Sequence, residues 1–524
     1  MRDFQAPGRS AVFATEGMCA TSHPLAAKVA LDLLQQGGNA VDAAIGAGVL
    51  LGLCEPQMTG LGGDCFMLLK PAGSERIVTV NGSGRAPAGA DAGALRALGL
   101  DAVPVYGVES VTLPGAVDAF CQVSADWGRL GLADTLAPAI RYAEIGVPVA
   151  PRVAYDWAEP THLQGAARRH YLNGSVSLRS GQIFRAPSQA EVLRRIAREG
   201  RAGFYEGEVA QDLIDSLREM GGCHTLDDLA ATTCTYGDPI RSAYRNLDLF
   251  EHAPNGTGAV ASLILNILQH FDMASLDPLG PERAHLEAEA TKLAYDARNR
   301  FIADPDHTTR LAHLLAPETA AQLASLIDPT RVLPDVAPLT EAIHRDTVYI
   351  TVVDRDRMAV SLIYSIFHSF GSGLASDKFG ILFQNRGAGF TLTKGHPNEM
   401  AGGKRPMHTI IPAMLGENGR ITMPFGVMGG AYQPVGHARL VTNLRDHGME
   451  LQSAIDAPRA FVENGTLALE TGYPIATAQA LTDLGHQVIL SPGPRGGAQA
   501  IRIHADGVLE GASDPRKDGC ALGC

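Results

Sequence analysis

The chain changes its pattern at Thr347, and this change limits the folds open to it. Helical patterns dominate before Thr347, whereas apolar and β-branched runs typical of strands recur after it, beginning with Val348–Val353. The ordinary interpretation of Thr347 is therefore the start of a buried strand. A helix-rich part followed by a strand-rich part predicts layers of helices and sheets around one core, with no flexible linker between them.

Boundary residues place the expected elements. Ser22-His23-Pro24 predicts the start of a helix, and Gly37-Gly38 predicts its end. A second helix is expected over residues 39–53, and a third over about 282–302, where Asp304-Pro305 stops it. The expected strands are 348–353, 359–363, 381–384, 409–414 and 487–490.

Charge and hydropathy exclude several classes of protein. The formal net charge is −13 and no dense Lys/Arg cluster is present, which argues against a nucleic-acid or membrane-surface binder. The longest apolar stretch, Ala40 to Cys54, contains Asp42 and three glycines and is too short to span a bilayer. Residues 1–10 lack the apolar core of a secretory signal, so we expect a cytoplasmic protein that acts on a small molecule.

Cysteines and glycines give no indication of a cofactor. The eight cysteines are scattered without paired spacing, so reduced thiols are expected rather than a zinc site or a disulfide framework. The Gly-x-Gly matches at Gly46 and Gly60 lack the strand, loop and helix order of a dinucleotide site. The sequence therefore predicts neither a metal nor an organic cofactor.

Thr347 also has a chemical interpretation. A threonine hydroxyl inside a chain is a poor nucleophile unless a base lies nearby. Cleavage of the bond between Asp346 and Thr347 would create a free α-amine with a pKa of about 7.7 to 8.0. That amine can accept the hydroxyl proton at neutral pH, so one residue supplies both nucleophile and base. The proline-containing stretch 329–346 is expected to lie at the surface and to lead into this bond.

Acyl transfer to Thr347 also requires donors for a tetrahedral oxyanion. Backbone N–H groups aimed at that oxygen contribute roughly 2.7 to 4 kcal/mol each. Gly429-Gly430 has the side-chain-free backbone that favours such an oxyanion hole. In isolation a Gly-Gly pair is more often an ordinary turn, so this assignment depends on the surrounding motifs.

A series of short motifs runs from about residue 10 to the C-terminus. They are His23-Pro24-Leu25-Ala26, Gly37-Gly38-Asn39-Ala40-Val41-Asp42-Ala43-Ala44, Glu55-Pro56, Gly60-Leu61-Gly62-Gly63, Pro114-Gly115, Phe204-Tyr205-Glu206-Gly207, Asp304-Pro305-Asp306, Phe370-Gly371-Ser372-Gly373, Gly403-Lys404-Arg405-Pro406 and Asp514-Pro515-Arg516. In this order they resemble the γ-glutamyltranspeptidase family. The resemblance implies an α+β fold, the four-layer αββα sandwich of N-terminal nucleophile hydrolases. It also implies self-cleavage into a large segment, 1–346, and a small segment, 347–524, that form one interlocked domain.

The same resemblance implies roles for individual residues. Thr347 is implied as the nucleophile, and Gly429-Gly430 as the oxyanion hole. Ser365 occupies the place of a threonine that assists autoprocessing. His408 and Thr409 occupy the place of a pair that contacts the substrate carboxylate, with His408 in place of a serine.

Two charges that would hold a γ-glutamyl group are missing from this chain. Ser83-Gly84-Arg85 stands where the resemblance implies an arginine for the glutamyl α-carboxylate, so that charge is absent or moved to Arg85. Ala388-Gly389 replaces the acidic pair that receives the α-amine. Arg386 then becomes the candidate for binding a substrate carboxylate, with a structural ion pair as an equal alternative. His368 is either a substrate contact or a hydrogen-bonded structural histidine.

These substitutions set the order of the functional hypotheses. The sequence around Ser365 and Arg386 is similar to a hydrolytic, oxamate amidohydrolase-like branch, so we expect an autoprocessed amidohydrolase acting on a small carboxylate-bearing amide. A γ-glutamyltransferase or glutathione hydrolase is the nearest alternative, and an uncleaved, non-catalytic binding protein is a remote one. The expected partners are the amide substrate and the two subunits from one precursor, with a dimer of these heterodimers as a further expectation.

Overall fold

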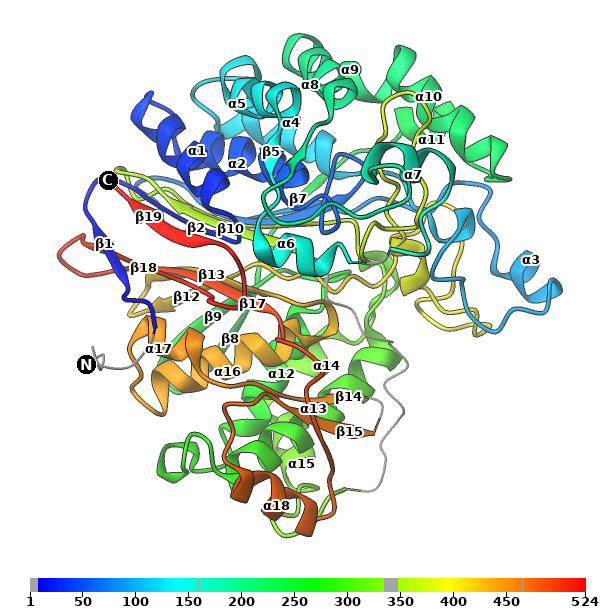
Figure 1. Cartoon of the computed structure of the whole chain (residues 1–524). Helices are drawn as coiled ribbons and strands as arrows, with labels where there is room; N and C mark the ends of the chain where they lie inside the picture. The colour runs from blue at the N-terminus through cyan, green and yellow to red at the C-terminus, as the bar shows by residue number, and fades with distance from the viewer. Residues whose placement is uncertain (1–7, 159, 334–346, 464) are drawn as a thin grey trace.

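The computed structural model describes residues 8–158, 160–333, 347–463 and 465–524. Two seven-stranded antiparallel sheets lie face to face, and helices cover the outer face of each sheet (Figure 1). A cluster of apolar side chains that includes Met18, Val353, Ile421 and Ile501 is packed between the sheets. The predicted α+β fold with αββα layers is therefore confirmed.

The first sheet has the strand order β19-β2-β10-β11-β3-β4-β7. Its interior strand β10 (Val348–Val353) pairs with β11 (Ala359–Ser365) on one side and with β2 (Met18–Thr21) on the other. The remaining strands are β3 (Asp64–Lys70), β4 (Val78–Gly82), β7 (Thr235–Gly237) and β19 (Cys520–Gly523). Every residue of β10 and β11 is buried, because both faces of the sheet are covered.

The second sheet has the order β1-β18-β17-β13-β12-β9-β8. Its strands are β1 (Val12–Ala14), β8 (Ile240–Tyr244), β9 (Leu247–Glu251), β12 (Ala413–Glu417), β13 (Arg420–Met428), β17 (Gly497–Ile503) and β18 (Leu509–Ser513). Two small sheets are formed by β14 (Ala460–Glu463), β15 (Thr466–Leu469) and β16 (Gln487–Leu490), and by β5 (Val147–Pro148) and β6 (Ile183–Phe184).

The helices on the first sheet are built around α2 (Ala40–Cys54), which is buried along its whole length. Asn39 and Asp42 form a reciprocal capping box that satisfies its first N–H groups. Gly46 allows close packing, since a Cβ there would lie 2.6 Å from the carbonyl oxygen of Thr135. The other helices of this half of the chain are α1 (Pro24–Gln35), α3 (Ala92–Ala97), α4 (Ala116–Trp127), α5 (Leu132–Ile145), α6 (Pro151–Asp156), α7 (Gly165–Tyr171), α8 (Pro187–Glu199), α9 (Ala202–Tyr205), α10 (Gly207–Glu219) and α11 (Leu226–Ala230).

The helices on the second sheet centre on α12 (Gly258–Leu268), which is also buried throughout. It packs against α13 (Pro281–Phe301), the helix predicted over 282–302, and against α16 (Gln433–Arg445). The remaining helices are α14 (Leu311–Leu315), α15 (Pro317–Ala324), α17 (Leu451–Asp456) and α18 (Ile475–Asp483). These helices form the lower layer in Figure 1.

Both large sheets contain strands from both sides of Thr347. In the first sheet β10, β11 and β19 follow Thr347, whereas β2, β3, β4 and β7 precede it. The second sheet is mixed in the same way, with β1, β8 and β9 from the earlier part. Asp346, on the other side of the predicted cleavage point, lies outside the described residues. A break next to Thr347 would leave two chains that share both sheets.

Two of the predicted strands differ in the structure. Residues 381–384 form only an isolated bridge between Leu382 and Ala375, so that prediction was wrong. The apolar residues of this segment are buried as expected, but its backbone bonds to loops, including the bond from Ser372 N–H to the Phe383 carbonyl at 2.9 Å. The strand predicted from residue 409 begins at Ala413 instead, because the N–H of Ile411 bonds a glutamine side chain rather than a strand.

Candidate active site

Thr347 lies directly before β10 and is 1% exposed. The antiparallel register pairs Val348 with Tyr364, which brings Ser365, the last residue of β11, beside Thr347. The Thr347 hydroxyl donates a hydrogen bond to Ser365 Oγ at 3.3 Å. The predicted nucleophile and the predicted processing residue are therefore neighbours at one end of the first sheet.

Arg386 joins the same cluster as the first residue of a short 3-10 helix, η4 (Arg386–Gly389), and its side chain is fully buried. Its Nη2 donates to Ser365 Oγ at 3.3 Å, and its Nη1 donates to Thr409 Oγ1 at 3.1 Å. The structure thus brings Thr347, Ser365, Arg386 and Thr409 together although they are separated in the sequence. We call these four residues the Thr347 cluster.

Phe367 covers the guanidinium of Arg386 in an unusual backbone conformation. Its ring centroid lies 3.9 Å from the Arg386 Cζ, within the range of a cation–π contact. Its φ is +79°, a region that costs a bulky residue of the order of 1 to 3 kcal/mol. The Phe367 N–H donates to Ser365 Oγ at 2.9 Å, which helps to hold this conformation. Strain of this kind is typical of functional sites, and the sequence analysis did not single out this residue.

The strands β10 and β13 cross the interior in opposite directions. Val353, at the end of β10, belongs to the same packed cluster as Ile421, near the start of β13. Tyr349, near the start of β10, belongs to the same cluster as Met428, the last residue of β13. The residues that precede β10 and the residues that follow β13 therefore lie at the same end of the interior.

Gly429-Gly430 directly follows β13, at the end of the interior where Thr347 lies. The two glycines have φ values of +125° and +56°, which favour glycine over any residue with a Cβ. A Cβ on Gly429 would also lie 2.8 Å from the Cα of Gly496. The backbone here has the form of a turn that favours glycine, at the same end of the interior as Thr347, and the role of its N–H groups as an oxyanion hole stays a prediction.

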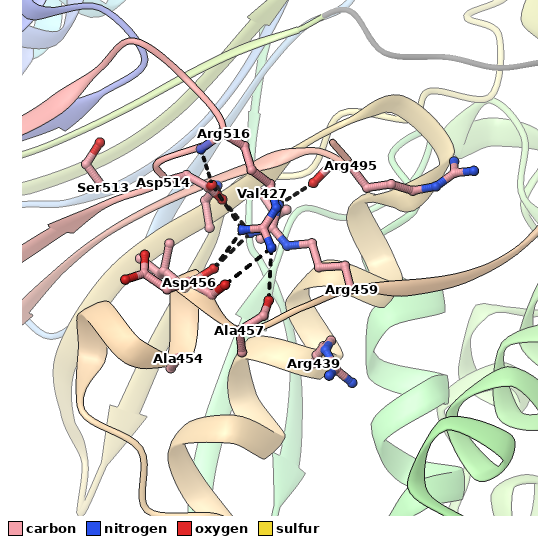
Figure 2. A network of polar contacts seen from close by, with 12 residues as sticks. Val427, Arg439, Ala454, Asp456, Ala457, Arg459, Arg495, Ser513, Asp514 and Arg516 are labelled. Carbon is pink, nitrogen blue, oxygen red and sulfur yellow. Dashed lines mark hydrogen bonds and ion pairs between the residues drawn. The ribbon is translucent and has the colours of Figure 1, made fainter. Parts of the chain in front are cut away.

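Four ionic residues lie behind this turn, with Arg459 and Asp514 buried and Glu470 and Arg516 partly buried, and we call them the Asp514 cluster. Asp514 forms ion pairs with Arg459 and, at 3.2 Å, with Arg516 (Figure 2). Arg516 also pairs with Glu470 at 2.6 Å. Burial by itself raises the pKa of Asp514, but the two guanidiniums lower it below its ordinary value. The Asp-Pro-Arg motif of the sequence is therefore part of a charge network.

The Asp514 cluster holds the loop that packs against Gly429. Arg459 donates to the carbonyl of Arg495 (Figure 2). Glu470 accepts from the Arg495 N–H at 2.8 Å. Asp514 accepts from the N–H of Ala498 at 2.7 Å. Gly496, between these anchored residues, is the one whose Cα limits the space at Gly429. The cluster therefore supports the position of the glycine turn.

We expect Asp514→Asn to weaken both stability and turnover. Removing the central charge leaves the buried Arg459 and the partly buried Arg516 incompletely paired, which should lower the free energy of unfolding by about 3 to 5 kcal/mol. In the fraction that folds, kcat should fall about 10- to 100-fold with little change in KM, because a small displacement of the turn affects the transition state most. Urea unfolding and steady-state kinetics measure the two effects. Asp377→Asn, in an exposed ion pair, is the control, and an unchanged kcat in folded Asp514→Asn would contradict the supporting role.

Asp64 is a fully buried carboxylate that the sequence analysis did not single out. It is the first residue of β3 and lies opposite Ser365 in the neighbouring strand. Its Oδ1 accepts hydrogen bonds at 2.8 Å from the Gly84 N–H and from Gln384 Nε2. The available signal was a lone acidic residue within the glycine and apolar run 60–69.

His408 contacts Asp64 rather than an open space. Its Nε2 donates to Asp64 Oδ2 at 3.2 Å, and its Nδ1 accepts from the Ile410 N–H at 3.4 Å. Burial, and then the charge of Arg386, hold the pKa of His408 well below its ordinary value, so the ring is neutral. Both ring nitrogens have protein partners here, and a contact of His408 with substrate stays a prediction.

A cavity of about 450 Å³ is lined in part by Phe367, whose ring covers the Arg386 guanidinium of the Thr347 cluster. Its wall includes Phe367, His368, Ala388, Gly389, Phe390 and Met407. The ring of His368 packs against Phe367 with 4.4 Å between centroids, and the side chain is nearly buried. Ala388-Gly389, which replaces the acidic pair, thus faces this cavity without supplying charge. His368 is placed where it can contact a ligand.

Arg85 lies apart from the Thr347 cluster. Its Nη1 donates to the carbonyl of Gly403 at 2.8 Å and lies 3.6 Å from Asp304 Oδ2, and its side chain is 40% exposed. Ser83 instead accepts a hydrogen bond from Asn255 Nδ2 at 3.0 Å. The charge proposed to have moved to Arg85 is engaged with other protein groups, and its role in binding stays a prediction.

The structure also bears on the state of the cysteines and on the question of membrane-spanning helices. All eight cysteines are free thiols, as the sequence analysis predicted. In the ranges that the structure describes, no helix is both long and apolar enough to cross a membrane.

Comparisons with known proteins agree with this fold. The sequence pattern of the family described as gamma-glutamyltranspeptidase matches residues 26–524. The chain is 36% identical to the oxamate amidohydrolase proenzyme of Klebsiella pneumoniae, over 97% of this chain and 98% of that protein. It is 34% identical to the glutathione hydrolase-like YwrD proenzyme of Bacillus subtilis, over 98% of this chain and 99% of that protein.

A solved structure gives the same result in three dimensions. The crystal structure of cephalosporin acylase from Bacillus halodurans superposes with a TM-score of 0.93, at 36% identity, over 100% of this chain and 99% of that one. The two relatives named above, which this chain matches over nearly their full length, are proenzymes. Large and small subunits from one precursor are therefore implied for this chain as well. The chain belongs to the γ-glutamyltranspeptidase family and is an autoprocessed amidohydrolase of the N-terminal nucleophile type.

Proposed function

We propose that the chain cleaves itself between Asp346 and Thr347 and then hydrolyses a small amide with a carboxylate next to or near the scissile carbonyl. The observation that carries this proposal is the position of Arg386. Ser365 Oγ links its guanidinium to the Thr347 hydroxyl, because it accepts hydrogen bonds from Arg386 Nη2 at 3.3 Å and from Thr347 Oγ1 at 3.3 Å. A buried guanidinium at this distance suits a carboxylate attached directly to the carbonyl under attack.

The reaction needs only groups from the protein and water. The free α-amine of Thr347 takes the hydroxyl proton as Oγ1 attacks the amide carbon, and the N–H groups of Gly429-Gly430 stabilise the oxyanion. The C–N bond then breaks, and the proton goes from the α-ammonium to the leaving ammonia or amine. Water attacks the resulting ester with the same amine as base, which releases the acid and restores Thr347.

A γ-glutamyl substrate fits this site less well. Its α-amine would meet Ala388-Gly389, which supplies no carboxylate, and Arg85 is engaged with Asp304 and Gly403. Each missing hydrogen bond to a charged group costs about 1.5 to 3 kcal/mol. We therefore rank a glutathione hydrolase or γ-glutamyltransferase second to the carboxylate-bearing amide.

The cavity beside Phe367 favours a further candidate, an acylase for larger amides. Its volume of about 450 Å³ exceeds what a two-carbon acyl group requires, and apolar residues form much of its wall. The structural similarity to a cephalosporin acylase agrees with this alternative. The larger group would occupy the cavity while its carboxylate bonds Arg386.

Hydrolysis of three amides by the processed protein distinguishes these candidates. Oxamate tests a small carboxylate-bearing amide, γ-glutamyl-p-nitroanilide tests the zwitterionic head, and glutaryl-p-nitroanilide tests a longer acid without the amine. We expect kcat/KM to be highest for oxamate or for the glutaryl compound. Efficient turnover of the γ-glutamyl compound above both would overturn the proposed specificity.

Carboxylate binding should weaken as the pH rises through about 6. Burial raises the pKa of Asp64 to about 6, although Arg386 acts to lower it, so Asp64 is mainly protonated below that pH. Above that pH the ionised Asp64 competes with the ligand carboxylate for the positive charge of Arg386. A repulsion of about 1 kcal/mol between the two carboxylates corresponds to roughly fivefold weaker binding of the ligand. The inhibition constant of oxalate, measured from pH 5 to 8, reports this step. Asp64→Asn should remove it, and a step that persists in that variant would exclude Asp64 as its cause.

We also propose that the protein is cytoplasmic and that two processed heterodimers associate. Eight free thiols agree with a reducing compartment. Cell fractionation and the mass of the processed protein in solution test the two statements separately.

A further inference from the structure

Outside the Thr347 cluster, three buried residues converge from two distant parts of the chain. Among the described residues, His285, Glu289 and His486 are the one group of His, Cys, Asp or Glu ligand atoms that all lie within 4.8 Å of one another. His285 and Glu289 share a face of α13 because they are four residues apart, and His486 directly precedes β16. His285 and Glu289 are 0% exposed, and His486 is 7% exposed.

The hydrogen bonds around this group fix the ring tautomers. His285 Nε2 lies 2.9 Å from the carbonyl of Asp328, so it carries the proton and donates it. His285 Nδ1 is then a lone pair, and it accepts from His486 Nε2 at 2.8 Å. Glu289 Oε2 accepts from the N–H of Leu333 at 2.9 Å, while Oε1 lies 4.0 Å from His486 Nε2. A histidine whose second nitrogen donates to a backbone carbonyl is the usual arrangement of a metal ligand.

We propose that His285 Nδ1, His486 Nε2 and Glu289 Oε1 bind one divalent transition-metal ion such as Zn²⁺. Two imidazole nitrogens and one carboxylate oxygen form a ligand set that Zn²⁺, Co²⁺ and Ni²⁺ accept, with a fourth position left for water. The ion replaces the proton between the two rings. That proton moves to Nδ1 of His486, so both rings stay neutral and no oxidant or base is consumed.

One further observation supports the same site. A cavity of about 210 Å³ lies against it, with Lys292, Val332, Leu333, Gly485, His486 and Gln487 in its wall. The cavity gives the ion a path and provides room for the fourth ligand.

Lys292 competes with the ion in the metal-free protein. Its Nζ lies 2.7 Å from Glu289 Oε1 and 3.2 Å from the Leu333 carbonyl. Metal binding must displace this ammonium from the carboxylate oxygen, whereas the bond to Leu333 can remain. The geometry therefore makes a directional prediction: a side chain without charge at position 292 should tighten metal binding.

A metal ion at this site would link α13 to the residue that precedes β16. Residues 328–333 form hydrogen bonds with both of these parts of the chain. Asp328 and Leu333 bond His285 and Glu289 on α13, and the N–H of Val332 bonds the Leu484 carbonyl close to His486. Metal binding should therefore raise the temperature of unfolding. The inference does not depend on the proposed substrate or on cleavage at Thr347.

The test is titration of EDTA-treated, desalted protein with Co²⁺, followed by displacement with Zn²⁺. We expect one Co²⁺ per chain with visible d–d absorption, loss of that absorption in His285→Gln and His486→Gln, and no change in His270→Gln, an exposed histidine elsewhere. Lys292→Met should bind Co²⁺ several-fold more tightly than the unsubstituted protein. Zn²⁺ should raise the melting temperature of the unsubstituted protein and of His270→Gln, but not of His486→Gln.

Several outcomes would overturn the proposal. They are absence of stoichiometric Co²⁺ binding, binding that persists in both histidine variants, and affinity that is unchanged or weaker in Lys292→Met. The lysine variant keeps the test decisive even where His285→Gln fails to fold, because it leaves all three ligands in place. Weak binding of several ions per chain would identify adventitious sites only.

Discussion

Replacing Thr347 with alanine is expected to abolish both self-cleavage and amide hydrolysis. The substitution removes the hydroxyl that attacks the carbonyl, and removal of a nucleophile costs roughly 10⁴-fold or more in kcat. On a denaturing gel the unsubstituted protein should give bands of about 36 and 19 kDa, corresponding to residues 1–346 and 347–524. The variant should give one band at 55.2 kDa.

Thr347→Ser is the matched control, because it keeps the hydroxyl and, after cleavage, the α-amine. It should retain cleavage and a measurable part of the turnover. Two bands from Thr347→Ala, or hydrolysis by it at the normal rate, would place the nucleophile elsewhere. A single band from the unsubstituted protein, with no difference between it and Thr347→Ala in any assay, would favour an uncleaved binding protein.

Replacing Arg386 with glutamine should reduce kcat/KM for a carboxylate-bearing amide by about 10² to 10⁴-fold. Two hydrogen bonds from a guanidinium to a carboxylate are worth about 1.5 to 3 kcal/mol each, and glutamine keeps neither the charge nor the two-pronged geometry. Arg386→Lys should show an intermediate loss, since it keeps the charge only. The loss should appear mainly in KM, because the carboxylate is bound in both the ground state and the transition state.

The same measurements separate substrate binding from a structural ion pair. Hydrolysis of an uncharged amide should change little in Arg386→Gln if the guanidinium binds the substrate carboxylate. An equal loss for charged and uncharged amides would instead show that Arg386 acts through Ser365 and Asp64. Arg241→Gln, at an arginine that is 65% exposed in a surface ion pair, should leave both activities unchanged.

Much of the fold and part of the site could be predicted from local sequence. The β-branched run after Thr347 predicted β10, and the capping and stop residues predicted α1, α2 and α13 within a few residues. Ser365 is the last residue of β11, and Gly429-Gly430 directly follows β13. Both strands end at the side of the interior where Thr347 lies. The strand and helix predictions succeed because strand periodicity and helix caps are properties of neighbouring residues, whereas the roles of Ser365 and Gly429-Gly430 rest on the family resemblance and stay predictions.

The rest depended on contacts between distant residues. Asp64 and Ser365 are brought together by strand pairing, and Arg386 reaches Thr409 from a short 3-10 helix. The strand expected over 381–384 failed because its apolar residues are buried in a loop, and periodicity alone does not distinguish buried loops from buried strands. Distant pairing of this kind has no local signal in a single sequence.

The sequence by itself determined which groups are present for the proposed chemistry: a threonine that could supply base and nucleophile after cleavage, an adjacent pair of glycines, and no charge at positions 388 and 389. Only the tertiary structure decided where those groups meet. Folding places the Arg386 guanidinium beside the Ser365 hydroxyl, brings Arg85 close to Asp304, and supports the turn at Gly429 through Asp514. The physical reason is that reactivity at a threonine follows from its own atoms, whereas specificity follows from the charges that folding brings within hydrogen-bonding distance.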